Sequence, residues 1–286
     1  VVTRAIYREA LEGRGSEHGG AYLDISHRPA DFIKSKLPSM YEQFRALADV
    51  DITRGPMEIA PTVHYAMGGV RVEAETGATT VPGLFAAGEV AAGLHGSNRL
   101  GGNSLTDLLV FGRRAGEAAA QHATGVELPR IDMQQVQEEK HLLLRPFESG
   151  GNENPYLLHQ ELQDVMSEHA GIARDEASMS QGLQKVLELQ ERSGRIDVRG
   201  SRMFNPAWHM ARDDLFMLTV AEAVMRAAIE RKESRGAHYR TDFPDKDPAL
   251  ESVNFIVCKS ERGMQLQPAP IPPLPAELAA VLKETS

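Results

Sequence analysis

The sequence predicts an α/β segment, then an antiparallel helical domain, then an irregular carboxy-terminal tail. Short alternating runs and glycine-rich loops mark residues 1–126, which are typical of a mixed segment. Helical periodicity with polar faces marks residues 127–240, and prolines crowd residues 241–286. A proline-bounded stretch near residue 55 further separates 1–55 from 56–126. We therefore expect these parts to be structurally distinct.

The first part predicts short elements. Residues 1–12 have a helical pattern that Gly13 closes, and residues 21–26 alternate like a strand. Residues 30–48 predict two short helices separated by Pro38, because proline is tolerated only in the first turn of a helix.

The second part predicts a strand, a glycine-rich loop and a helix, in that order. Residues 70–75 alternate, and residues 84–89 resemble a short buried strand. A loop with several glycines follows, and Ser104 is expected to cap a helix that runs to about His122.

The third part predicts helices over residues 132–144, 155–169, 173–193 and 211–232, joined by short breaks that contain glycine or proline. In the tail, residues 252–258 are strand-like and a proline-rich end follows.

Composition excludes several functional classes. The net charge of −9 argues against nucleic acid as the main partner, although local arginines can still bind a small anion. The longest apolar runs, such as 215–220, are too short to span a bilayer. The single cysteine, Cys258, excludes an internal disulfide and an iron–sulfur cluster held by this chain alone, which fits a reducing compartment; no metal site is expected.

Residues 97–104 carry the clearest chemical signal. Paired glycines before a helix N-terminus let a ligand approach the backbone, and the free N–H groups there favour negative charge. Arg99 adds a planar fork that suits a carboxylate. The alternative is an ordinary glycine-rich turn with a solvated arginine.

Two further side chains have both structural and functional interpretations. His64 lies in an apolar run that a glycine pair ends, so we expect it to be partly buried, as a core residue or as a donor to a carboxylate. Glu89 ends a predicted strand, where a ribose or ribityl hydroxyl is accepted in doubly wound domains, or where a carboxylate forms a salt bridge. No G-x-G-x-x-G motif occurs, since His18 stands where a third glycine after Gly13 and Gly15 would be.

Longer motifs carry a specific resemblance. They are His-Tyr-Ala-Met-Gly-Gly at 64–69, Pro-Gly-Leu-Phe-Ala-Ala-Gly-Glu at 82–89, His-Gly-Ser-Asn-Arg-Leu-Gly-Gly-Asn-Ser-Leu at 95–105 and Glu-Ser-Arg-Gly-Ala-His at 233–238. In content, order and spacing, the chain resembles the flavoprotein subunit of succinate dehydrogenases and fumarate reductases over nearly its whole length.

The resemblance implies a role for individual residues. His64 and Arg99 correspond to the family's dicarboxylate-binding histidine and arginine, and Glu89, Ser104 and Leu105 correspond to contacts with FAD. It also implies the end of a capping domain over 1–55 and the carboxy-terminal part of the FAD-binding domain over 56–126. The implied reaction interconverts succinate and fumarate by hydride transfer at FAD N5.

The same resemblance implies partners and a location. The family's flavoprotein passes electrons to an iron–sulfur subunit, and indirectly to membrane-anchor subunits of a respiratory complex, at the cytoplasmic face of the inner membrane. The physiological direction stays open. L-aspartate oxidase is an alternative, although it usually has Asn-Arg-Met-Ala-Ser-Asn where this chain has Asn-Arg-Leu-Gly-Gly-Asn at 98–103. A non-catalytic docking module is a second alternative.

The resemblance also implies that part of the site is missing. The family's proton-shuttling arginine, in Arg-Asp-Val-Val, would stand just before Val1, and Arg4 does not correspond to it. The family's pyrophosphate-binding motif and flavin-linking histidine lie further upstream. We therefore interpret Val1 as a cut end and expect no catalytic residue within the segment itself.

We predict that the 286-residue chain alone neither retains FAD nor oxidises succinate, because a proton-transfer group must lie within hydrogen-bond reach of its proton. Incubation with FAD, desalting, flavin absorbance and succinate-dependent dye reduction test this. Stoichiometric flavin with turnover would contradict the truncation hypothesis.

Overall fold

The computed structural model describes residues 2–277 and 280–281. It divides into two compact units, one up to Tyr65 and one from Ala66 onward, and each is described by itself. The expected cut end at Val1 lies outside the described residues. No helix of the described ranges is long and apolar enough to cross a membrane.

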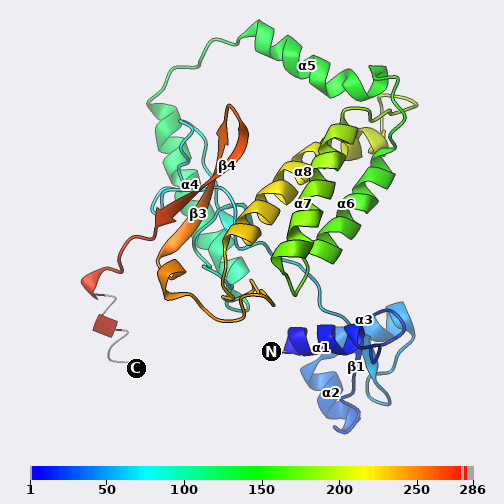
Figure 1. Ribbon diagram of the computed structural model, residues 1–286. Helices are drawn as coiled ribbons and strands as arrows, with labels where there is room; N and C mark the ends of the chain where they lie inside the picture. Colours follow the sequence, from blue (N-terminus) through cyan, green and yellow to red (C-terminus); the bar gives the residue numbers. More distant parts are fainter. Residues whose placement is uncertain (1, 278–279, 282–286) are drawn as a thin grey trace. The chain divides into compact units, whose positions relative to one another are not determined.

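The first unit contains three helices and a two-stranded sheet, namely α1 (Val2–Leu11), β1 (Ala21–Leu23), α2 (Ala30–Lys36), α3 (Pro38–Ala48) and β2 (Met57–Ile59) (Figure 1). The strands pair antiparallel, and Ala21 lies opposite Ile59. Its small core is formed by Ile33, Tyr41, Ile52 and Met57.

The predicted elements of this unit form at or near their expected positions. Gly13 follows α1 with a φ of 75°, the left-handed conformation that glycine adopts without strain. Pro38 occupies the first turn of α3, so it begins the second helix after α2 ends at Lys36. The strand expected over 21–26 is shorter, because only residues 21–23 pair with β2.

The two strands predicted at the start of the second unit do not form. Residues 70–75 and 84–89 contribute one isolated bridge each, Val70 to Ala91 and Ala78 to Phe85. A strand requires consecutive pairs along one neighbour, and within the described residues each segment has a partner at a single position. Residues 88–90 instead form a short 3₁₀ helix, η1 (Gly88–Val90).

The helix after the glycine-rich loop is α4 (Asn103–Thr124), which extends slightly beyond the predicted end at His122. Its N-cap residue is Gly102, in the left-handed conformation with a φ of 85°, and no side chain caps the helix. The prediction that Ser104 is the cap was wrong, because Ser104 already lies inside the first turn. The backbone alone therefore forms the start of α4.

Four helices follow, α5 (Met133–Glu148), α6 (Pro155–His169), α7 (Glu176–Ser193) and α8 (Pro206–Glu230). The last three lie side by side in Figure 1, and their buried residues form one hydrophobic core, including Leu158, Met179, Leu218 and Met225. Asn154 and Asp175 cap α6 and α7 through their side chains.

The start of α8 lies several residues before the predicted position, 211. Asn205 accepts the Trp208 N–H and Pro206 occupies the first turn, so the cap signal lies upstream of the apolar periodicity. Trp208 then donates its indole N–H to the Leu143 carbonyl of α5 at 2.7 Å. This contact joins α5 to the three-helix core.

The tail is more regular than predicted. β3 (Val253–Ser260) and β4 (Gly263–Pro270) pair along their whole length as an antiparallel hairpin. Pro268 lies opposite Phe255 within it. A two-stranded sheet leaves one edge of each strand without a neighbour, so proline, which lacks an N–H, is tolerated in it. Proline content therefore did not indicate irregular structure here.

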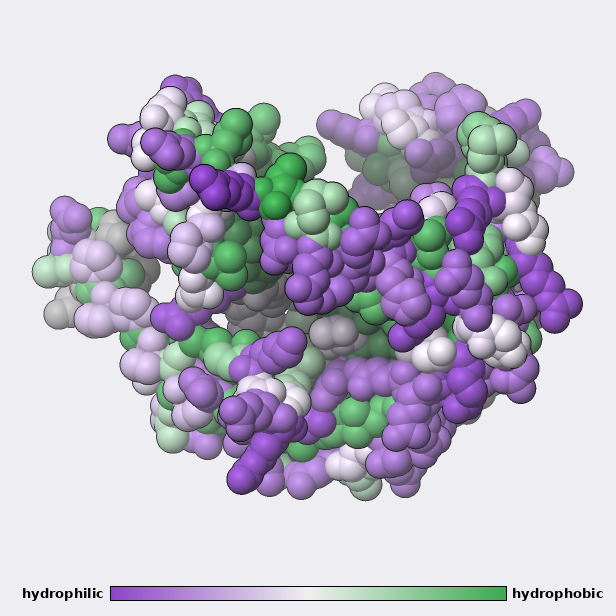
Figure 2. Space-filling view, turned by 90° about the horizontal axis from the view of Figure 1, so that it is seen from above, coloured by the Kyte–Doolittle hydropathy of each residue, from purple (hydrophilic) through white to green (hydrophobic). Residues whose placement is uncertain are grey.

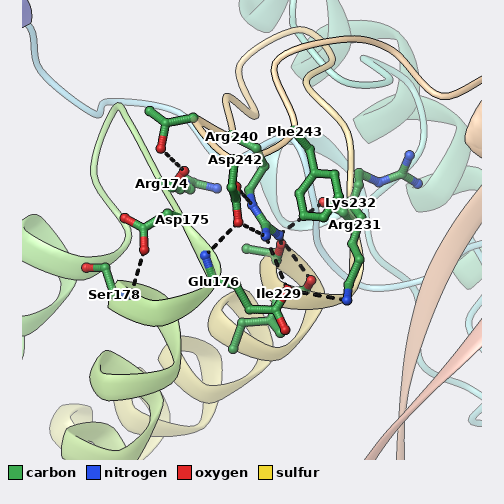
Figure 3. Close-up of polar contacts among 12 residues, drawn as sticks. Arg174, Asp175, Glu176, Ser178, Ile229, Arg231, Lys232, Arg240, Asp242 and Phe243 are labelled. Carbon is green, nitrogen blue, oxygen red and sulfur yellow. Dashed lines mark hydrogen bonds and ion pairs between the residues drawn. The ribbon is translucent and has the colours of Figure 1, made fainter.

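A buried arginine joins the ends of two helices in the second unit (Figure 3). Arg240 is fully buried, and its Nη1 donates to the carbonyls of Ala228 and Ile229, at the end of α8, at 3.0 and 3.1 Å. Its Nε and Nη2 form a bidentate pair with Asp242 at 2.7 and 2.6 Å. Asp242 in turn accepts the Glu176 N–H at the start of α7 at 2.9 Å.

A buried carboxylate, that of Glu233, lies in the same segment. It accepts hydrogen bonds from Arg231 at 2.5 Å, from Arg235 at 2.9 Å and from the Asp247 N–H at 2.9 Å. Burial alone would raise the pKa of Glu233, but these donors override it and lower the pKa to about 2.

Apolar side chains also reach the surface, as the green patches of Figure 2 show. On α4 the exposed apolar residues include Leu105, Leu108, Leu109 and Val110. The outer surface of this helix is therefore unusually apolar for a solvated face.

We predict that Glu233→Gln lowers the free energy of unfolding at pH 7 by about 3 kcal/mol, because Arg231 and Arg235 lose a charged partner. Since the folded pKa lies below the unfolded value of about 4.5, the stabilisation is complete above that value and is lost as the pH falls toward 2. Urea unfolding followed by circular dichroism at both pH values measures the difference.

The matched control is Glu117→Gln on α4, whose carboxylate is 65% exposed beside Arg113. It should cost less than about 0.5 kcal/mol at either pH. Equal losses for the two variants at pH 7 would contradict the role of Glu233.

Candidate functional site

The glycine-rich loop before α4 is held by a buried pair. His95 Nε2 lies 3.4 Å from Asp107 Oδ2, and the two side chains are only 9% and 5% exposed. Asp107 belongs to the second turn of α4, so the pair fastens the beginning of the loop to the helix that ends it. This contact keeps the beginning of the loop close to the helix that follows it.

Arg99 lies in this loop, four residues after His95, with a partly exposed side chain. Its Nη1 donates to the Leu100 carbonyl at 3.4 Å. On the other side, the Ser97 carbonyl accepts the Ala237 N–H at 3.0 Å. The predicted anion-binding arginine therefore lies between Ser97, which the Ala237 N–H fixes, and the start of α4.

Glu89 lies in η1, which packs against α4. A Cβ on Gly88 would lie 2.5 Å from Leu108 Cδ2, so the two elements are in close contact. Glu89 Oε1 accepts the Ala66 N–H at 3.0 Å. An ionised carboxylate has about four acceptor positions, so this exposed side chain can accept further hydroxyl groups.

The start of α4 has the features of a cofactor contact. Ser104 and Leu105 are in its first turn, half-buried and exposed respectively. Cβ atoms on Gly101 and Gly102 would meet nothing within 4 Å. An uncapped helix start with open space over its glycines fits an electron-rich edge of a flavin.

His64 belongs to the first unit and is exposed, which corrects the expectation that it is partly buried. Its apolar neighbours in the sequence do not cover it, since Val63 is 91% exposed. The Nδ1 atom lies 3.5 Å from the Thr62 carbonyl. Convergence of His64 with Arg99 stays a prediction, because the two residues lie in separately described units.

Two sets of contacts at this loop were not predicted from the sequence. The histidine–aspartate pair beneath the loop follows no spacing rule, since His95 and Asp107 belong to a loop and a helix. The contact of Ser97 with Ala237 joins segments 140 residues apart in the sequence. In the sequence, the feature that could have indicated this contact is Gly236 within the Ser-Arg-Gly-Ala-His motif. Within the described part of the chain, no three His, Cys, Asp or Glu side chains are grouped as metal ligands.

Two protein-family models match this chain. Residues 1–105 match the model of an FAD binding domain, and residues 159–271 match the fumarate reductase flavoprotein C-terminal model.

Full sequences agree with these matches. The chain is 44% identical over 261 residues to a fumarate reductase (CoM/CoB) subunit of Methanothermobacter marburgensis, covering 91% of this chain and 47% of the relative. It is 38% identical over 264 residues to the succinate dehydrogenase flavoprotein subunit of Coxiella burnetii, covering 87% and 45%.

Solved structures agree as well. Mycobacterium smegmatis Sdh1 in complex with UQ1 matches with a TM-score of 0.90 and 45% identity, covering 99% of this chain and 49% of that one. The chain thus spans about half the length of the relatives it matches. The matched regions together include the glycine-rich loop, the start of α4 and the helical core, and the chain belongs to the succinate dehydrogenase and fumarate reductase flavoprotein family.

Proposed function

We propose that the protein acts as the flavoprotein subunit of a succinate:quinone oxidoreductase, which interconverts succinate and fumarate. The observation that carries this proposal is the anchored loop with Arg99, directly before the uncapped start of α4. A planar guanidinium held in place can bind a carboxylate through two parallel hydrogen bonds. Members of the family named for either substrate support this chemistry.

In this proposal Arg99 and His64 bind the two ends of a four-carbon diacid. Arg99 binds one carboxylate bidentately, and His64 donates to the other. His64 is an exposed residue. Holding both ends orients the central carbon–carbon bond for reaction. Proton transfer is assigned to no described residue of this chain.

FAD supplies the hydride acceptor when it is bound. Glu89 would accept a hydroxyl of its ribityl or ribose group, and Ser104 and Leu105 would contact the ring system. The N–H groups at the start of α4 carry partial positive charge, so they favour negative charge on the pyrimidine edge. Because that charge grows on reduction, the contact should raise the flavin potential.

The electron partner of this subunit would be an iron–sulfur subunit. Membrane-anchor subunits would hold the complex at the inner membrane, and this chain would contact them only indirectly. Succinate oxidation and fumarate reduction share one site, so direction depends on flavin potential and quinone. Fumarate reduction is the alternative physiological direction.

We predict that Arg99→Lys lowers kcat/KM for succinate by about a hundredfold, although the positive charge is retained, because the lysine ammonium cannot form the bidentate pair. Steady-state turnover of the flavin-loaded enzyme measures the effect. Arg113→Lys is the control, since Arg113 lies on α4 and is 79% exposed. Turnover near the parental rate in Arg99→Lys would refute the assignment.

A further inference from the structure

A tight turn at residues 235–238 contacts the glycine-rich loop that carries Arg99, which is called the arginine loop below. Arg235 N–H donates to the His238 carbonyl at 2.9 Å, and His238 N–H donates back to the Arg235 carbonyl at 3.1 Å. At its tip, Gly236 has a φ of 60° and Ala237 donates its N–H to the Ser97 carbonyl. The turn and the loop therefore meet backbone to backbone.

Buried polar contacts make this turn stiff. Glu233, fully buried, binds the Arg235 guanidinium through two hydrogen bonds of 2.9 Å. His238 Nε2 donates to the Arg231 carbonyl at 3.0 Å, and its Nδ1 lies 3.2 Å from Arg174 Nη1. Burial, and then the neighbouring arginines, lower the pKa of His238. The ring is consequently neutral at pH 7, and its Nδ1 can accept from Arg174.

At Gly236 the turn packs so closely against Ser97 that a side chain does not fit between them. A Cβ there would lie 2.4 Å from the Ser97 carbonyl oxygen and 2.5 Å from Ser97 Oγ. Ordinary contact begins at 3.4 Å, so a methyl group would displace the Ser97 backbone by about 1 Å. Ser97 stands two residues before Arg99. A shift of its carbonyl is therefore passed directly to the arginine.

We propose that Gly236 is a positioning residue for dicarboxylate binding: through Ser97 it sets the place of the Arg99 guanidinium. The inference rests on the proposed function, in which Arg99 binds a carboxylate. It assigns to the helical domain a part in substrate affinity, because the turn follows directly after α8. A misplacement of about 1 Å in a binding group can cost on the order of a hundredfold in rate.

The test compares Gly236→Ala with Gly150→Ala in the flavin-loaded enzyme that contains this sequence. Gly150 has a nearly identical φ of 58°, but a Cβ there would meet nothing within 4 Å. Both substitutions carry the same left-handed backbone strain, and only one displaces the loop. The probe is malonate, a dicarboxylate that lacks the two adjacent methylene groups needed for oxidation, so its competitive inhibition constant reports binding alone.

We expect Gly236→Ala to weaken malonate binding and to lower kcat/KM for succinate, each by about a hundredfold relative to Gly150→Ala. Flavin content should be the same in the two variants, whereas Gly236→Ala should lower the thermal midpoint more, because only its Cβ overlaps a neighbouring backbone. Equal malonate affinity in the two variants would overturn the proposal, since a purely structural glycine would affect only stability.

If Gly236→Ala does not fold, amide exchange in the parental enzyme decides the question. Malonate should slow exchange of the Ala237 N–H, whose acceptor belongs to the arginine loop, more than exchange of core amides in α7. Unchanged exchange at Ala237 would contradict the proposal.

Arg99→Lys separates this inference from the proposed function. If that variant keeps full malonate affinity, Arg99 does not bind the carboxylate and the proposed function fails. If it loses affinity while the two glycine variants match, only the positioning role of Gly236 fails.

Discussion

The organisation of the second unit depends on one buried charge, the guanidinium of Arg240. Leaving a charge without partners in a protein interior is very unfavourable, so each of its donors must be satisfied. The carbonyls that end α8 and the carboxylate of Asp242 provide the acceptors. The same carboxylate accepts an N–H at the start of α7, where negative charge is favoured. One ion pair thus sets the relation between two helix ends.

This constraint extends to the candidate site. The chain leaves α8 at Glu230, passes through the buried contacts of Glu233 and reaches the turn at Gly236 before it returns to Arg240. Because buried contacts fix the chain at Glu233 and again at Arg240, the position of the turn between them is also fixed. The loop that carries Arg99 packs on it. Substrate affinity would then depend on packing at the turn of residues 235–238, which follows α8.

Much of the fold follows from local patterns. The helices at 155–169 and 30–48 were predicted with correct or nearly correct ends, because proline and capping residues mark them. The strands expected at 70–75 and 84–89 failed for a different reason. Their alternation describes a preference for a sheet, but a strand exists only when a neighbour pairs with it. The strand expected over 252–258 forms as β3, but its partner β4 was not predicted, because Pro268 and Pro270 lie within it.

The sequence by itself determined the family, the helical content and the identity of the candidate ligands Arg99, His64 and Glu89, because motifs, caps and periodicity are local properties of the chain. Tertiary structure alone decided how the arginine loop is held. The pair of His95 with Asp107 and the contact of Ser97 with the turn at Gly236 join segments that no spacing rule connects. Local patterns record which conformation each residue prefers, whereas the position of a binding group is set by the distant backbone that packs against it.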